Sequence, residues 1–258
     1  MSYARIAGVG SFLPEKIVTN TDLEKTMDTS DEWIRERTGI RQRHIAGKDD
    51  TTGSMGLEAA RRAMTEAGVG PDDIDLIILG TATPDKIFPS TACIIQRRLG
   101  VSGGPAFDVH AACSGFLYAL DAANRYMRTG GAKKALVIGS ETLSRITNWE
   151  DRGTAVLFGD GAGAIVLEQS DEPGILSTHI HADGQYEDLL QVEPGVSVGY
   201  DVTRAGGAFI KMEGNAVFRR AVATFDNIAR ETVAVLDGHL DDIDWFVPHQ
   251  ANMRIIQA

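Results

Sequence analysis

One cysteine of this sequence stands where a thiolate nucleophile would be favoured. Cys113 follows the apolar run 107–109 through a turn of small residues, and an apolar-periodic segment that we predict to be a helix begins directly after it. The unpaired N–H groups and the dipole of a helix N-terminus favour negative charge, so they should lower the pKa of the thiol. A buried structural cysteine is the alternative, since free cysteines are among the most buried residues.

A histidine occupies a comparable place late in the sequence. His249 follows the apolar run 245–247, which we predict to be a buried strand, so its ring should lie at the carboxyl end of that strand. Ligands and catalytic groups collect at such ends in open α/β sheets. A thiol and an imidazole that share one cavity suit acyl transfer, in which the sulfur attacks a thioester carbonyl and the imidazole supplies a proton or a hydrogen bond. The alternative for His249 is a core histidine satisfied by backbone groups.

An internal match would place these two residues in related halves. The segments 71–80 and 240–249 both contain Asp-Asp-Ile-Asp ahead of an apolar run, and both follow a helix-like segment. This matched context favours an internal duplication over chance. The first copy runs to about residue 168, so we predict one half at 1–168 and the start of a second, incomplete half at 169–258.

Helix and strand signals alternate along the chain. Apolar strands of the buried type are predicted at 74–79 and 135–140, with further strands at 6–10, 155–158 and 164–168. The predicted helices are one capped by Asn20 or Thr21 with Glu24 in a capping box, 31–37 between Ser30 and Gly39, 51–67, 89–99 before Gly100, and 113–128. This alternation predicts an α/β architecture with a mostly parallel sheet.

Composition limits the classes of function. The chain has 258 residues, 43% of them hydrophobic and 24% charged, which is typical of soluble globular proteins. Its net charge of −11 argues against general affinity for nucleic acid or anionic membranes. The two cysteines, Cys93 and Cys113, make no disulfide framework, and neither a signal peptide nor a membrane span is evident, so a cytoplasmic protein is expected.

A set of motifs resembles a known enzyme family. The motifs are Asp-Thr-Ser-Asp-Glu-Trp-Ile at 28–34, Arg-Thr-Gly-Ile at 37–40, Phe-Asp-Val at 107–109, Ala-Ala-Cys-Ser-Gly-Phe at 111–116, Asp-Arg-Gly-Thr at 151–154, Phe-Gly-Asp-Gly-Ala-Gly-Ala at 158–164, His-Ala-Asp-Gly at 181–184 and Val-Pro-His-Gln-Ala-Asn at 247–252. In this order they resemble the thiolase-fold condensing enzymes, and among them the β-ketoacyl-[acyl-carrier-protein] synthase III family. The resemblance implies a thiolase-like fold with two similar βαβ-type halves in a layered αβαβα arrangement.

The resemblance also implies a reaction. Cys113 would take a short acyl group from acyl-CoA, malonyl-carrier protein would then lose CO₂, and the resulting carbanion would attack the acyl-cysteine. The product is a β-ketoacyl-carrier protein, which initiates fatty acid synthesis. His249 would stabilise the enolate, and the backbone N–H of Cys113 would donate to the other oxyanion. No cofactor is implied, because acyl-CoA and malonyl-acyl-carrier protein are both substrates.

Binding residues follow from the same resemblance. Coenzyme A would be bound by Trp33, Arg37, Thr38, Arg152, Asn215, Phe218 and Asn252. Phe88 and Leu190 would line the acyl pocket, with Phe88 reaching across a homodimer interface, and Arg219 and Arg254 would dock the acidic carrier protein. From the residues alone, core packing and solvated helix faces are the alternatives for these positions.

The family pattern is also incomplete in this sequence. The family places an Asn in a Gly-Asn-Thr-Ser-like motif some 30 residues beyond its His and adds a late glycine-rich loop, whereas this sequence ends nine residues after His249. The expected third catalytic group is therefore not in the sequence, which leaves a non-catalytic acyl-CoA-binding module open as an alternative.

Other functions were weighed against the condensing reaction. A type III polyketide synthase-like or β-ketoacid-forming condensing enzyme is the nearest enzymatic alternative. A dinucleotide-binding site at the glycine run 159–163 is rejected. The Rossmann motif needs a helix directly after its glycines, whereas the segment after this run is strand-like. A metal site is not expected at His179 and His181, because no third ligand is evident.

Overall fold

The structure is a computed structural model that describes residues 3–201 and 207–258, and the chain divides into two compact units. The first unit comprises Met1–Lys16, His44–Thr142 and Asp160–Ile180, and the second comprises Ile17–Arg43, Leu143–Gly159 and His181–Ala258. Their segments interleave along the sequence, so they differ from the halves 1–168 and 169–258. That division of the sequence stays a prediction.

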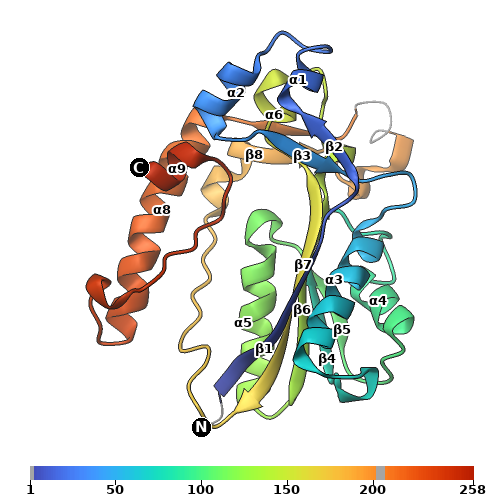
Figure 1. Cartoon of the computed structure of the whole chain (residues 1–258), viewed down its shortest axis with the longest axis vertical. Coiled ribbons are helices and arrows are strands. Elements are labelled where there is room, and N and C mark those ends of the chain that lie inside the picture. Colours follow the sequence, from blue (N-terminus) through green and yellow to red (C-terminus); the bar gives the residue numbers. More distant parts are fainter. Residues whose placement is uncertain (1–2, 202–206) are drawn as a thin grey trace. The chain divides into compact units, whose positions relative to one another are not determined.

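A five-stranded mixed sheet forms the centre of the first unit (Figure 1). The strand order is β1 (Tyr3–Phe12), β7 (Asp160–Ser170), β6 (Lys134–Thr142), β4 (Leu76–Gly80) and β5 (Ala106–Val109). β4 pairs in parallel with β5 and β6, but β7 is antiparallel to β1 and β6, so the prediction of a mostly parallel sheet is wrong. No helix packed on the sheet links β6 to β7. The connection runs through the second unit, and β7 returns in the opposite direction.

Helices cover both faces of this sheet. α3 (Thr52–Ala67) and α4 (Thr91–Leu99) pack on the face that carries Ile77, Leu79 and Ile138, and α5 (Gly115–Arg128) packs on the face that carries Ile78 and Val137 (Figure 1). Successive strand residues point to opposite faces, so β4 and β6 are apolar at nearly every position. The sequence prediction of two buried strands is confirmed.

Local capping signals set the helix ends correctly in most cases. α2 (Asp31–Thr38) begins at Ser30, whose hydroxyl accepts from Trp33 N at 3.1 Å, and it ends at Gly39 with φ of 78°. Thr51 caps α3, and α4 lies between the cap Ser90 and Gly100.

The predicted cap of the first helix is wrong. α1 (Asn20–Leu23) is capped by Thr19, which forms a capping box with Asp22, where the sequence prediction had Asn20 or Thr21 with Glu24. The amide of Asn20 is engaged elsewhere, because it donates to Asp31 and to the carbonyl of Ile40.

The second unit contains short sheets and helices. β2 (Lys16–Thr19) pairs with β3 (Gln42–Ile45) at its boundary, and β8 (Leu190–Glu193) pairs antiparallel with β9 (Phe209–Met212). Besides α1 and α2, the described residues of this unit include the helices α6 (Arg152–Ala155), α8 (Gly214–Val235) and α9 (Met253–Gln257).

Two predicted strands are not strands. Residue 155 ends α6, and 156–158 carry no strand pairing. The run 245–247 also forms no strand, and Trp245 is 86% exposed. A strand is stabilised by a partner's hydrogen bonds, and within 3–201 and 207–258 no segment pairs with this run.

The two matched sequence segments do fold alike where they begin. Pro71–Asp73 and Leu240–Asp242 each form a 3₁₀ turn in which an aspartate carboxylate accepts from the backbone N–H three residues earlier, Gly70 N at 2.9 Å and His239 N at 2.7 Å. The shared Asp-Asp-Ile-Asp motif therefore encodes one local structure twice.

Candidate active site

The turn that carries Cys113 joins β5 to α5. Cys113 lies in a 3₁₀ turn, Ala112–Ser114, and α5 begins at the next residue, as the sequence predicted. The turn is tight enough to place Ala112 at φ of +43°, a left-handed conformation that alanine rarely adopts. Cys113 is exposed and is one of the two free cysteines.

Two glycines let this turn lie directly on the sheet. A Cβ added at Gly80, the last residue of β4, would lie 2.4 Å from the carbonyl carbon of Gly115 and 2.7 Å from Phe116 N. Backbone therefore packs on backbone at the start of α5. The side chain of Phe116, the residue after Gly115, packs on Gly139 of β6. A Cβ added at Gly139 would lie 3.4 Å from the Phe116 side chain. The glycines of β4 and β6 thus fix how far Cys113 lies above the sheet.

A carboxylate that sequence reasoning missed lies beside this turn. Glu141, near the end of β6, accepts from Ala82 N at 2.7 Å, from the Thr81 hydroxyl at 3.3 Å and from the Thr83 hydroxyl. The Thr83 hydroxyl in turn accepts from Thr142 N at 2.9 Å. Its position directly after the apolar run 135–140, predicted to be a buried strand, is the sequence signal that would have found it.

These surroundings oppose ionisation of the thiol. Burial of the sulfur by neighbouring atoms raises the pKa of Cys113, and the Glu141 carboxylate raises it further, although the residue as a whole is exposed. A backbone hydrogen bond at Cys113 lowers this pKa, but the two opposing effects are larger, so the predicted net lowering is wrong. The pKa of Glu141 is also raised by burial. The three hydrogen bonds and the nearby His110 lower it, but their effect is smaller than that of burial.

His249 lies in the extended segment between the turn Leu240–Asp242 and α9. Partial burial of the ring lowers the pKa of His249 from its ordinary value, although the residue as a whole is exposed, so the neutral imidazole is favoured near pH 7. A neutral imidazole can donate one hydrogen bond and accept another. Cys113 belongs to the first unit and His249 to the second, and their pairing stays a prediction.

Three of the residues predicted to bind coenzyme A meet in the second unit. The guanidinium of Arg152 lies 4.7 Å from the centroid of the Trp33 ring, and that of Arg37 lies 5.5 Å from it. Arg152 also donates to the carbonyl oxygen of Asp28 at 2.8 Å. An indole flanked by two guanidinium groups combines a flat stacking surface with positive charge, which suits an adenine nucleotide.

The other predicted coenzyme A residues are spread along the same unit. Thr38 is buried, and its hydroxyl donates to Ile34 O at 2.7 Å and accepts from Ile40 N at 3.0 Å. Asn252 caps α9, whose Met253 packs against Gly39 at the end of α2. Asn215 is exposed at the start of α8.

The residues predicted for carrier docking lie on α8 and α9. Arg219 is exposed on α8, and Arg254 is exposed on α9 with its guanidinium 5.5 Å from the Phe218 ring. Their role stays a prediction.

The two predicted acyl-pocket residues lie in different units. Phe88 is 82% exposed and precedes α4, and Leu190 begins β8. The start of α4 is held by Asp108 of β5, whose carboxylate accepts from Thr91 N and Ala92 N at 2.7 Å each. The segment after Phe88 is thereby fixed to the strand that leads to Cys113.

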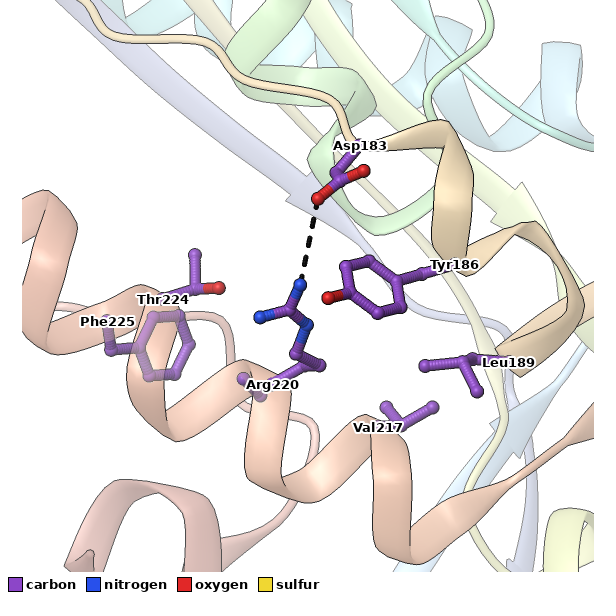
Figure 2. Close-up of a pocket in the computed structure, with 8 residues that line it drawn as sticks. Asp183, Tyr186, Leu189, Val217, Arg220, Thr224 and Phe225 are labelled. Carbon is purple, nitrogen blue, oxygen red and sulfur yellow. Dashed lines mark ion pairs between the residues drawn. The ribbon is translucent and has the colours of Figure 1, made fainter.

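A separate cavity of about 490 Å³ opens beside α8 (Figure 2). Arg220 is one of the residues that line it, with the guanidinium 3.6 Å from the Tyr186 ring centroid and 3.6 Å from an Asp183 oxygen. Val217 and Phe225 supply apolar wall. None of the predicted site residues lines this cavity, so it is not the site that the sequence predicted.

Within 3–201 and 207–258, no group of three or more His, Cys, Asp or Glu side chains could hold a metal ion. His181 contacts Glu231 at 2.8 Å, and His179 contacts Ser177. No helix in the described part of the chain is long and apolar enough to cross a membrane.

Comparisons with known proteins point to one family. The profile of the 3-oxoacyl-[acyl-carrier-protein (ACP)] synthase III family matches residues 107–184, which include Cys113. The β-ketoacyl-[acyl-carrier-protein] synthase III of Thioalkalivibrio sulfidiphilus is 60% identical over 258 residues, which are 100% of this chain and 80% of that protein. The enzyme of the same name from Xanthomonas campestris is 57% identical, over 99% of this chain and 79% of its own length.

Solved structures agree with the sequence relatives. The crystal structure of 3-oxoacyl-[acyl-carrier-protein] synthase III from Aquifex aeolicus has a TM-score of 0.91 at 45% identity, over 98% of this chain and 79% of that one. The priming β-ketosynthase of the R1128 polyketide pathway has a TM-score of 0.94 at 39% identity, over 99% of this chain and 76% of that one. The thiolase-like α/β fold and the condensing-enzyme class that the motifs indicated are thereby confirmed. The chain belongs to the β-ketoacyl-[acyl-carrier-protein] synthase III family.

Proposed function

We propose that this protein condenses a short acyl-CoA primer with malonyl-acyl-carrier protein and so initiates fatty acid synthesis. The sulfur of Cys113 attacks the thioester carbonyl of the primer, its proton leaves with the coenzyme A thiol, and an acyl-cysteine remains. A thiol whose pKa is raised keeps its proton until substrate arrives. The backbone N–H of Cys113, at the start of a helix, donates to the oxyanion that forms on the attacked carbonyl.

In the second half-reaction, malonyl-carrier protein loses CO₂ and the resulting carbanion attacks the acyl-cysteine carbonyl. The carbon–carbon bond forms, Cys113 leaves as a thiolate, and the thiolate takes up a proton from solvent water. Charge builds on the malonyl thioester oxygen as CO₂ leaves, and a preorganised donor there contributes about 3–4 kcal/mol. His249, whose pKa is lowered, is a neutral donor suited to this position.

Binding would be divided among the remaining residues. Trp33 stacks on adenine with Arg152, Arg37 binds the phosphates, and Thr38, Asn215, Phe218 and Asn252 line the pantetheine path. Phe88 and Leu190 limit primer length, and Arg219 and Arg254 dock the acidic carrier protein. We further propose a cytoplasmic homodimer that needs no cofactor.

The observation that carries this proposal is the position of Cys113, on a strained turn fixed by backbone contact at the carboxyl end of β4. The test is intact-mass analysis after exposure to acetyl-CoA, followed by addition of malonyl-acyl-carrier protein. We expect one acetyl group on Cys113, loss of this group in Cys113→Ala, and normal acetylation in the matched variant Cys93→Ala. Absence of acetylation would contradict the proposed enzymatic activity and favour a non-catalytic acyl-CoA-binding module.

A related condensing enzyme is the second candidate, because a polyketide-priming β-ketosynthase matches with a TM-score of 0.94. The same experiment discriminates between them if carrier proteins of both pathways are supplied. Turnover only with the polyketide carrier, or release of a free β-ketoacid, would replace the fatty acid assignment.

A further inference from the structure

The proposed reaction makes no use of a buried arginine in the second unit. Arg43 of β3 is 5% exposed. Its guanidinium donates to three oxygens, those of Val18 O at 3.2 Å, Asn20 Oδ1 at 2.9 Å and Val156 O at 3.0 Å. Burial lowers the pKa of Arg43, yet a guanidinium stays charged in proteins, and within the described residues its Nε has no partner. A charge buried in this way needs every hydrogen bond it can make.

One of these partners, Asn20, holds both ends of the helix that carries Trp33. Asn20 is 1% exposed, and its amide nitrogen donates to Asp31 Oδ1 and to Ile40 O, each at 2.8 Å. Asp31 is the first residue of α2, and Ile40 follows its terminal glycine. Because the oxygen of the same amide accepts from Arg43, the guanidinium is coupled to the whole of α2.

Another partner, Val156, caps the helix that carries Arg152. Val156 is the C-cap residue that follows α6, and Arg152 is the first residue of that helix. One planar guanidinium therefore reaches the end of α6 directly and both ends of α2 through Asn20. These are the two helices whose side chains, Trp33 and Arg152, face each other at 4.7 Å.

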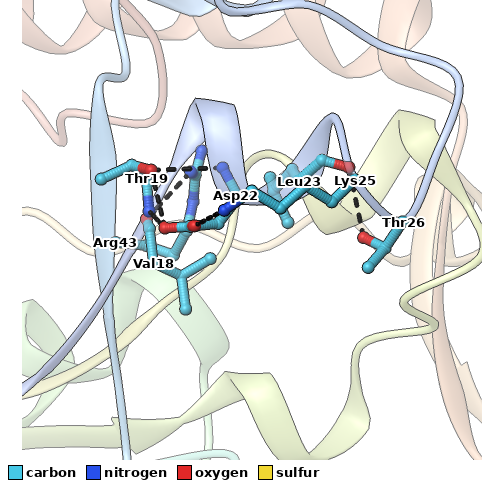
Figure 3. Close-up of polar contacts among 7 residues, drawn as sticks. All are labelled: Val18, Thr19, Asp22, Leu23, Lys25, Thr26 and Arg43. Atoms are coloured by element: carbon cyan, nitrogen blue, oxygen red, sulfur yellow. Dashed lines mark hydrogen bonds and ion pairs between the residues drawn. The ribbon is translucent and has the colours of Figure 1, made fainter.

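Asn20 is itself held in place. Thr19 and Asp22 form the capping box of α1, with Thr19 Oγ1 2.7 Å from Asp22 Oδ2, and Lys25 donates to the other oxygen of Asp22 at 2.7 Å (Figure 3). The Lys25 and Thr19 contacts hold the pKa of Asp22 well below its usual range, so the box stays intact at neutral pH. The figure shows Arg43 beside this box.

We propose that Arg43 is a positioning residue that sets the spacing between Trp33 and Arg152 and thereby the affinity for the adenine nucleotide of acyl-CoA. This inference rests on the proposed function, since it assigns adenine to the Trp33 site. Arg43 touches neither substrate nor nucleophile, so its effect should be confined to donors that carry the nucleotide.

The test compares two acetyl donors, acetyl-CoA and acetyl-pantetheine, which lacks the nucleotide. The first variant is Arg43→Lys, which keeps the charge and loses the planar guanidinium with its several donors. The second is Asn20→Asp, which keeps an acceptor for Arg43 and loses both hydrogen bonds donated to α2. Arg41→Lys is the control, because it makes the same change at an exposed side chain two residues away. Binding of free coenzyme A is measured alongside by calorimetry.

We expect both variants to raise KM for acetyl-CoA and Kd for coenzyme A by about tenfold. The KM for acetyl-pantetheine and the kcat with either donor should stay within about twofold of the parent protein. In a Trp33→Ala background, where the stacking surface is gone, Arg43→Lys should add nothing further.

Several results would overturn the inference. Equal increases in KM for both donors would mean that Arg43 only supports the fold, and an effect no larger than that of Arg41→Lys would mean that the planar guanidinium of Arg43 is unimportant. Failure of the parent protein to acetylate Cys113 would contradict the proposed function instead, and the calorimetric Kd of the same variants would still decide the role of Arg43.

Discussion

Replacement of Gly80 by alanine should displace the nucleophile without touching it. The added Cβ would lie 2.4 Å from the carbonyl carbon of Gly115, about 1 Å short of ordinary contact, and only 2.6 Å from its oxygen. Both obstacles are backbone atoms, so no side chain can rotate away. The start of α5 must move by about 1 Å, and a misplacement of that size costs on the order of 100-fold in rate.

The assay is the rate of Cys113 acetylation by acetyl-CoA, followed by intact mass, with urea unfolding measured in parallel. Gly80→Ala should acetylate about 100-fold more slowly and lose about 1–3 kcal/mol of unfolding free energy through overpacking. Gly163→Ala is the matched control, because a Cβ at Gly163 on β7 of the same sheet would meet nothing within 4 Å. Equal acetylation rates in the two variants would refute the reasoning that backbone contact fixes the turn.

Three further predictions concern charge and capping. Glu141→Gln should shift the pH midpoint of Cys113 alkylation by iodoacetamide to lower pH, since the carboxylate raises the pKa of the thiol; an unchanged midpoint would show that the two groups do not interact. Ser30→Ala should lower the unfolding free energy in urea by about 1 kcal/mol through loss of the α2 cap, and Ser30→Asp should restore it. Asp108→Asn should also lower the unfolding free energy in urea by about 1 kcal/mol, because a negative charge at the N-terminus of α4 is lost. If the substitution lowered the unfolding free energy equally at low and at high salt, charge would not be the cause.

Features that are encoded locally were predictable from the sequence. Ser30 and Gly39 bound α2 by side-chain capping and by a left-handed glycine, each of which depends only on neighbouring residues. The apolar runs of β4 and β6 are unambiguous because both of their faces are covered. The order of motifs was likewise sufficient to identify the family.

Features that depend on distant partners were not predictable. The run 245–247 has the composition of a strand, but a strand requires a neighbour, and composition does not supply one. The pKa of Cys113 was predicted from its own helix, whereas the structure brings Glu141 from another strand beside it. The direction of β7 likewise depends on the route of the chain between two strands and not on the residues of either.

The carboxylate of Asp108 has a consequence for the range of primers. It lies on the strand that leads to Cys113 and binds the first two N–H groups of α4, just after Phe88. The backbone between the proposed nucleophile and the start of the proposed acyl pocket is therefore braced by two short hydrogen bonds. If Phe88 limits primer length as proposed, a smaller side chain at position 88 should admit longer primers without moving the reacting sulfur, because the hydrogen bonds of Asp108 do not depend on that side chain.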